Sequence, residues 1–162
     1  MTAALVVLAL FLSALTAGFL FAFAVVVMPG LETLEDAAYL RAFQRIDGVI
    51  QRGQPLFVLM WVGSMIAMLA ALVVGVGALQ GTDRLLLAGA ALLYLVGVHV
   101  PTVAVNIPLN NRVQQVDVDA LGPREHREAR VAFQARWNRW NRVRTGLGMG
   151  AVLLMLAVVV RL

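Results

Sequence analysis

The stretch LLLAGAALLYLVGVHVPTVAVNIPLNN, residues 85–111, decides the fold of this chain. It holds no Asp, Glu, Lys or Arg, and its imidazole, His99, is counted as neutral. A helix rises about 1.5 Å per residue and the hydrocarbon core of a bilayer is about 30 Å thick, so about 20 apolar residues cross it. We therefore expect a membrane-spanning helix here, over about 85–106.

Three further uncharged stretches flank this one, at 3–28, 54–80 and 145–160. The last is long enough to span a membrane only if its helix begins near Asn141, which places Arg144 at the membrane boundary. The first lacks a basic leader and exceeds the apolar core of a signal peptide, so we expect it to be a retained span. The sequence thus predicts one domain, 1–162, with spans at about 3–28, 54–80, 85–106 and 141–160.

Composition supports a membrane protein. Hydrophobic residues make up 61% of the 162 residues and charged residues 14%, with a mean hydropathy of +0.86. Soluble domains are nearer about 45–50% apolar and about 25% charged. These values exclude an ordinary soluble enzyme, a disordered chain and a nucleic-acid-binding domain, although the net charge is +4. The chain has no Cys, which excludes disulfides, thiolate metal sites and cysteine nucleophiles.

Arginines orient the predicted spans. Every arginine except Arg84 and Arg161 falls in the connections 29–53 and 106–144, and there is no Lys. Because cytoplasmic connections carry the excess of basic residues, we expect both termini outside and both long connections in the cytoplasm, in the plasma (inner) membrane. The short turn at 80–84 makes its flanking helices antiparallel, so the fold class predicted is an all-α, up-down-up-down four-helix bundle.

Both long connections are predicted to be largely helical. Over 31–52, apolar and polar residues recur at helical spacing, which is typical of an amphipathic helix at the bundle end. The apolar stripe is Tyr39, Phe43, Ile46 and Ile50, and the polar stripe beside it is Gln44, Asp47 and Gln51. In the second connection, Gly122-Pro123 favours a helix start from which the long fourth helix continues into the membrane.

Two polar stripes enter the predicted spans. On the third helix the stripe is His99, Thr102, Asn106 and Asn110; on the fourth it is Gln134, Trp137, Asn141 and Arg144, with Trp140 at its edge. Polar groups in hydrocarbon are costly and face the bundle interior, so we expect the two stripes to converge on one pocket. Pro101 and Pro108 should kink the third helix there. No carboxylate lies inside a span, which argues against a proton-coupled exporter, and no spacing indicates a metal site.

Three motifs carry a family resemblance. TVAVNIPLNN at 102–111 resembles the T…N-V-P-L-N signature of the anthrone oxygenase-like family, small four-helix membrane proteins of which many are catalogued only as a domain of unknown function. WNRWNRVRT at 137–145 is similar to a second signature, W…W-N-x-V-R-T, and FQRID at 43–47 resembles a third, M-Q-x-I-N. Family members often have His at the position of Arg142 and Asn at the position of Asp47.

The resemblance implies a cofactor-independent oxygenase that oxidises an anthrone or another activated phenol with dioxygen. In that hypothesis His99 is the base, Arg144 and the amides hold the oxyanion, and the tryptophans stack on the rings. The candidate catalytic residues are His99, Arg144, Asn106, Asn110 and Asn141; the candidate substrate-binding residues are Trp137, Trp140, Thr102 and Gln44. The expected partners are membrane lipid and a hydrophobic aromatic small molecule, with no nucleic acid, no metal and no cofactor.

Other interpretations stay open at the level of sequence. The tryptophans suit an interfacial belt, Arg144 an orientation anchor, His99 a bond to a carbonyl, and the asparagines helix association. The chain is then a non-catalytic protein that binds a lipid or quinone-like ligand. A third interpretation is a structural subunit or homo-oligomer assembled through the Gly146-x-x-x-Gly150 face.

Overall fold

The computed structural model describes residues 2–162, and every regular element in that range is helical. Four helices are long and apolar enough to cross a membrane: Thr2–Glu32, Pro55–Ala78, Gly81–Gln114 and Pro123–Arg161. Their most apolar windows have mean hydropathies between 1.9 and 2.5. The chain is therefore an all-helical protein of membrane type, as its composition predicts.

The long helices are divided by short π-helical segments, labelled η. In chain order the elements are α1 (Thr2–Ala22), η1 (Phe23–Val27), α2 (Met28–Glu32), α3 (Asp36–Gln51), α4 (Pro55–Ala78), α5 (Gly81–Ala91), η2 (Leu92–Val98), α6 (His99–Pro101), η3 (Thr102–Asn106), α7 (Ile107–Gln114) and α8 (Pro123–Arg161). The segments from α5 to α7 form one continuous helix, which we call helix three.

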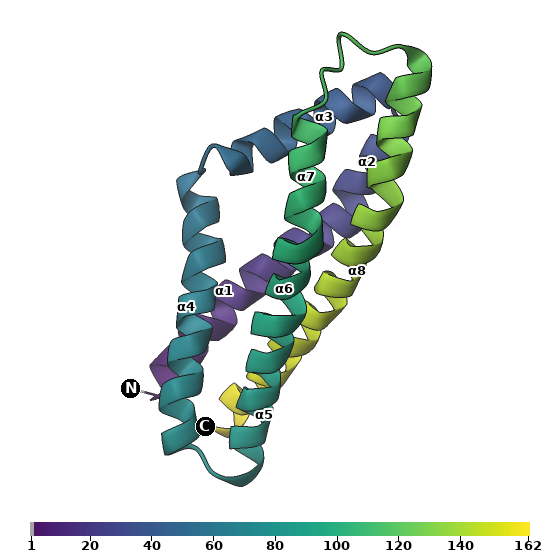
Figure 1. The fold of residues 1–162 in the computed structure, drawn as a ribbon. Helices are drawn as coiled ribbons and strands as arrows, with labels where there is room; N and C mark the ends of the chain where they lie inside the picture. The colour runs from purple at the N-terminus through teal and green to yellow at the C-terminus, as the bar shows by residue number, and fades with distance from the viewer. Residues whose placement is uncertain (1) are drawn as a thin grey trace.

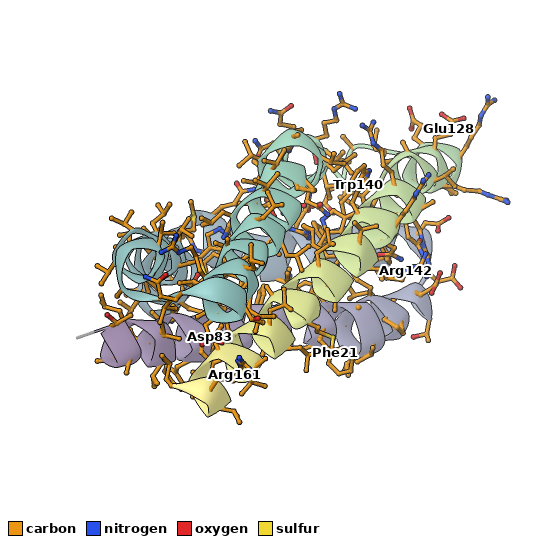
Figure 2. The ribbon with its side chains drawn as sticks, turned by 90° about the horizontal axis from the view of Figure 1, so that it is seen from below. Phe21, Asp83, Glu128, Trp140, Arg142 and Arg161 are labelled. Atoms are coloured by element: carbon orange, nitrogen blue, oxygen red, sulfur yellow. The ribbon has the colours of Figure 1, made fainter. Side chains whose placement is uncertain are left out.

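The long helices alternate in direction along the chain (Figure 1). Both termini and the α4–α5 turn lie at one end of the molecule, whereas α3 and the α7–α8 connection lie at the other. α1 packs against α4 and α8, and α8 also packs along helix three. At the end with the termini, Arg161 forms an ion pair with Asp83, and Figure 2 shows both side chains there. At the other end α3 lies across the long helices, where it contacts α7 and α8.

The two prolines at which a kink is predicted each follow a π-helical segment of helix three. Pro101 follows η2 and Pro108 follows η3. In η3 the N–H of Ile107 donates to the carbonyl of Thr102, five residues earlier. A π-turn admits one extra residue, so the side chains beyond it shift around the helix by about one residue position. The backbone remains helical through both prolines.

The predicted amphipathic helix is present as α3. Its apolar side buries Tyr39, Leu40 and Phe43, with Phe43 in contact with Phe133 of α8 at 4.4 Å between ring centroids. Arg130 fixes α8 to this region. Its guanidinium lies 4.4 Å from the centre of the Tyr39 ring and donates to Asp36 and to two backbone carbonyls. Burial raises the pKa of the Tyr39 hydroxyl, an effect partly opposed by the Arg130 charge, so Tyr39 stays neutral.

One glycine of the predicted pair, Gly150, faces a neighbouring helix, and so does Gly148 between the two. A Cβ at Gly148 would lie 3.5 Å from Ala17 of α1 and 3.5 Å from Val98 of helix three, so three helices meet at this position. A Cβ at Gly146, by contrast, would meet nothing within 4 Å. Gly150 faces Leu93 of helix three. Within the chain, Gly148 and Gly150 therefore both face neighbouring helices, whereas Gly146 does not.

Two hydrophobic clusters fill the interior. One lies toward the termini and includes Leu20, Met68, Tyr94 and Met155. The other lies toward α3 and includes Phe23, Phe43, Phe133 and Trp137. Buried polar side chains of helix three and α8 lie where these clusters meet: Thr102, Asn106, Asn141 and Arg144.

Candidate functional site

A cavity of about 200 Å³ lies between the two clusters. It is partly open, and the exposed side chain of Ile107 is one of its lining residues. Its walls are mainly aromatic and come from α1, η1, α3, α4 and α8: Phe19, Phe23, Phe43, Phe57, Trp61 and Trp137. Its polar lining consists of Asp47, Thr102, Asn106, Asn110, Asn141 and Arg144. Three of the four residues in each predicted stripe therefore converge on this cavity, and His99 and Gln134 do not.

Arg144 is the cation of this cavity. Its side chain belongs to a residue only 4% exposed, and it donates from Nη1 to Thr102 Oγ1 at 2.8 Å and from Nη2 to Asn141 Oδ1 at 3.0 Å. Its Nε is buried without a partner, and the guanidinium carbon lies 5.8 Å from the Trp137 ring centre. Among residues 2–162, Arg144 forms no ion pair. A buried guanidinium without a carboxylate is suited to bind an anion or a developing negative charge.

Two asparagines beside Arg144 are held in defined orientations. Asn141 donates from Nδ2 to the carbonyl of Leu20 at 3.1 Å, which leaves its Oδ1 facing Arg144. Asn106 donates from Nδ2 to the carbonyl of Trp137 at 3.4 Å, and its buried Oδ1 has no partner within residues 2–162. Each Nδ2 carries a second N–H that these bonds do not use. Arg144 and the two amides thus supply several donors to one end of the cavity.

A second polar group lies at the α3 end. Trp137 donates from Nε1 to Asn110 Oδ1 at 2.7 Å, and Asn110 donates from Nδ2 to Asp47 Oδ1 at 2.7 Å. Asp47 Oδ2 accepts from Gln51 at 2.7 Å and from Gln114 at 2.8 Å. These bonds connect α3, α7 and α8, so Asn110 holds Asp47 in place as well as lining the cavity.

His99, the predicted base, lies outside the cavity lining. Its ring packs edge-on against Trp61 at 5.2 Å and against Tyr94 at 5.0 Å between centroids. Its buried Nε2 has no hydrogen-bond partner in the described part of the chain. Because Trp61 itself lines the cavity, the imidazole lies behind one of the cavity walls.

Two predicted substrate-binding residues also lie outside the lining. Trp140 is half-buried against the α3 cluster. Gln44 donates to the carbonyls of Val113 and Val116, both at 2.8 Å, and so fastens α3 to the end of helix three. Arg142 points to the side of α8 opposite Trp140 (Figure 2) and lines a separate small pocket. The position where family members often have His is therefore not part of this cavity.

The aromatic walls on α1 and α4 were not predicted. Phe19, Phe23, Phe57 and Trp61 lie in sequences that are apolar on every side, so no periodicity distinguishes the cavity face. Asp47, by contrast, had a signal, because it belongs to the polar stripe predicted on α3. Within residues 2–162, no group of three His, Asp or Glu side chains is arranged to hold a metal ion.

Comparison with known proteins gives one match. The family model described as Anthrone oxygenase matches residues 48–154. That range includes Arg144, Asn106, Asn110 and Asn141 and begins directly after Asp47. No protein of curated function and no solved structure matches the chain.

Proposed function

The chain belongs to the anthrone oxygenase family, and from this premise we propose that it oxidises an anthrone-like or other activated phenolic substrate with dioxygen inside a membrane. One observation carries the proposal: the buried Arg144 guanidinium, without an ion-pair partner among residues 2–162, lines an aromatic-walled cavity. Such a group stabilises the negative charge that forms when an anthrone or phenol loses a proton.

The proposed reaction consumes one dioxygen per substrate. Loss of a proton from the anthrone methylene gives a phenolate-like anion, which passes one electron to dioxygen. Recombination of the radical pair forms a carbon–oxygen bond, and the resulting peroxide takes up the proton. Loss of water from this hydroperoxide leaves the quinone. The carbon is oxidised, dioxygen is reduced, and the products are one anthraquinone and one water.

The cavity residues divide this work. Arg144 holds the oxyanion, with the second N–H groups of Asn106 and Asn141 beside it. Phe23 and Phe43, whose ring centroids lie 5.8 and 5.7 Å from that of Trp137, form with it the aromatic walls for the fused rings. An engineered cavity of about 150 Å³ holds benzene. The cavity of about 200 Å³ therefore takes a larger aromatic that extends toward its opening beside Ile107.

We propose His99 as the base, conditional on movement of Trp61. The imidazole has an unpartnered Nε2 and lies directly behind Trp61. Rotation of the indole on substrate binding would bring Nε2 to the cavity and allow it to accept the methylene proton. His99→Gln should then abolish base catalysis, whereas Trp61→Ala should keep it.

The membrane arrangement belongs to the same proposal. The four helices form an up-down-up-down bundle with α3 and the first part of α8 in the cytoplasm and both termini outside. The grouping of the termini at one end supports placing both on the same side of the membrane. The distribution of arginines supports the orientation, because only Arg84 and Arg161 lie toward that end.

A second candidate function is reversible binding of a quinone-like ligand without turnover. The position of His99 behind Trp61 favours it, since no imidazole then reaches the ligand. Oxygen uptake distinguishes the two. Purified protein in lipid nanodiscs is mixed with an anthrone, and oxygen consumption and quinone formation are followed after subtraction of spontaneous oxidation. The oxygenase requires equal amounts of both above background; a bound ligand with no added uptake favours the second function.

A further inference from the structure

Asp47 is a buried carboxylate that the proposed oxidation does not use. Its residue is 3% exposed, and it lines the cavity at the end toward α3. Among residues 2–162 it forms no ion pair with an arginine or histidine. An ionised carboxylate away from water is costly unless hydrogen-bond donors surround it. The hydrogen-bond donors around Asp47 therefore show which acceptor position of the carboxylate stays free.

Three side-chain amides hold this carboxylate. Asn110 donates to Oδ1, and both Gln51 and Gln114 donate to Oδ2, at 2.7 to 2.8 Å. A carboxylate has about four lone-pair positions, two on each oxygen. Both positions on Oδ2 are occupied, whereas Oδ1 keeps one. The carboxylate can therefore accept one further hydrogen bond.

The direction of these bonds is fixed by groups outside the network. The indole of Trp137 is a donor only, so the Asn110 oxygen must face it and the Asn110 nitrogen must face Asp47. Gln114 Nε2 also donates to the carbonyl of Gln44 at 3.0 Å, which fixes its amide in the same sense. The amides of Asn110 and Gln114 therefore cannot exchange the positions of their oxygen and nitrogen, and Asp47 is the acceptor in both hydrogen bonds.

The opposite end of the cavity has the reverse polarity. Arg144 has five N–H donors, of which Thr102 and Asn141 accept two. On helix three, Arg144 contacts Thr102 and Asp47 contacts Asn110. These two positions are eight residues apart, or roughly 12 Å along a helix. Aromatic side chains line the cavity between Arg144 and Asp47. A ligand that satisfies both ends therefore carries an oxygen acceptor at one end and a hydrogen-bond donor at the other.

We propose that Asp47 is the residue that selects the substrate, by accepting a hydrogen bond from a hydroxyl at the far edge of an outer ring, away from the carbonyl that Arg144 binds. The inference rests on the proposed function for the orientation of the ligand. The substrate class is then a hydroxylated anthrone or hydroxyaryl ketone with oxygens at its two ends, and an unhydroxylated ring system binds less tightly.

Binding of redox-inert quinones tests this without any turnover. Three probes are compared: anthraquinone, beta-hydroxyanthraquinone and its methyl ether, which keeps the oxygen but cannot donate. Trp61 and Trp137 line the cavity, so quenching of tryptophan emission reports binding, with empty nanodiscs as the partition control. The pH is set where the phenol is protonated. The variants are Asp47→Asn and, as the matched control, Asp119→Asn, whose side chain is 86% exposed.

A hydrogen bond to a buried carboxylate corresponds to about tenfold or more in affinity. The wild type and Asp119→Asn should bind the hydroxy compound at least that much more tightly than the ether, and Asp47→Asn should reduce the ratio to about one while still binding anthraquinone. Equal binding of all three probes by the wild type overturns the role of Asp47 but not the oxygenase. If Asp47→Asn still binds the hydroxy compound more tightly than the ether, the role of Asp47 is likewise overturned and the oxygenase is not. Should Asp47→Asn fail to fold, the wild-type ratio of hydroxy compound to ether decides alone. If no quinone binds the wild type, both proposals fail.

Discussion

Arg144→Met is the variant that tests the proposed oxyanion site most directly. Methionine keeps an unbranched side chain in the cavity wall and removes the guanidinium. Loss of one preorganised donor to an oxyanion lowers kcat by about 10²–10³. Because Arg144 supplies both charge and several donors, we expect at least this loss, or about 3–4 kcal/mol in the barrier. The initial rate of quinone formation at saturating anthrone, corrected for spontaneous oxidation, measures it.

The same substitution should leave the fold intact. Thr102 Oγ1 loses the Arg144 donor but still donates to the carbonyl of Val98, and Asn141 still donates to Leu20, so Asn141 Oδ1 is the acceptor left unpaired. An unpaired acceptor costs about 1–3 kcal/mol, which the removal of a buried cation offsets. Arg142→Met is the matched control, since Arg142 is exposed on the other side of α8. A kcat of Arg144→Met within threefold of the wild type, with Arg142→Met unchanged, would refute the oxyanion role.

Three further predictions concern stability, measured by thermal unfolding in detergent. Arg130→Ala removes donors to α3 and to two carbonyls and should cost about 2–3 kcal/mol, whereas Arg124→Ala, with a side chain 91% exposed, should change stability by less than about 0.5 kcal/mol. Gly148→Leu overpacks the contact of three helices and should cost about 1–3 kcal/mol, with Gly146→Leu nearly neutral. Gln44→Ala leaves two carbonyls without their donor and should cost about 1–2 kcal/mol. Equal melting temperatures for Arg130→Ala and Arg124→Ala, or for Gly148→Leu and Gly146→Leu, would contradict the stabilising role of the contact concerned. A melting temperature of Gln44→Ala equal to that of the wild type would do the same for the contacts of Gln44.

The pairing of helix three with α8 could be predicted from the sequence because both stripes are polar within apolar surroundings. Asn106 and Asn141 must leave the lipid, and the interior is the place available to them. The family motifs pointed to the same residues, and the family match includes them. Polar exceptions in apolar helices therefore carry structural information that the apolar residues lack.

The apolar walls could not be predicted for the same reason. α1 and α4 are hydrophobic on all sides, so their lipid and cavity faces have the same composition. Phe57 and Trp61 line the cavity, while Leu56 and Leu59 beside them are exposed on the surface. Only the positions of the neighbouring helices distinguish these faces.

His99 shares a stripe with cavity residues but lies outside the cavity lining. At 100° per residue, His99 falls on the same stripe as Thr102 and Asn110. Neither π-helical segment lies between His99 and Thr102, since η2 ends at Val98 and η3 begins at Thr102. Thr102 reaches the cavity, whereas His99 packs against Trp61. A stripe therefore predicts which face of a helix is buried, and the side chains of neighbouring helices decide how far along that face a cavity extends.

The two prolines flank the part of helix three that contributes Thr102 and Asn106 to the donor end of the cavity. Pro101 and Pro108 each lack the N–H that an α-helix would use, and a π-turn precedes each of them. π-turns are uncommon and concentrate at functional sites. Here η3 begins at Thr102, the partner of Arg144, and ends at Asn106, whose oxygen is free within residues 2–162. The two side chains are four residues apart, a spacing that keeps both on one helix face, so the donor end of the cavity lies along this π-turn.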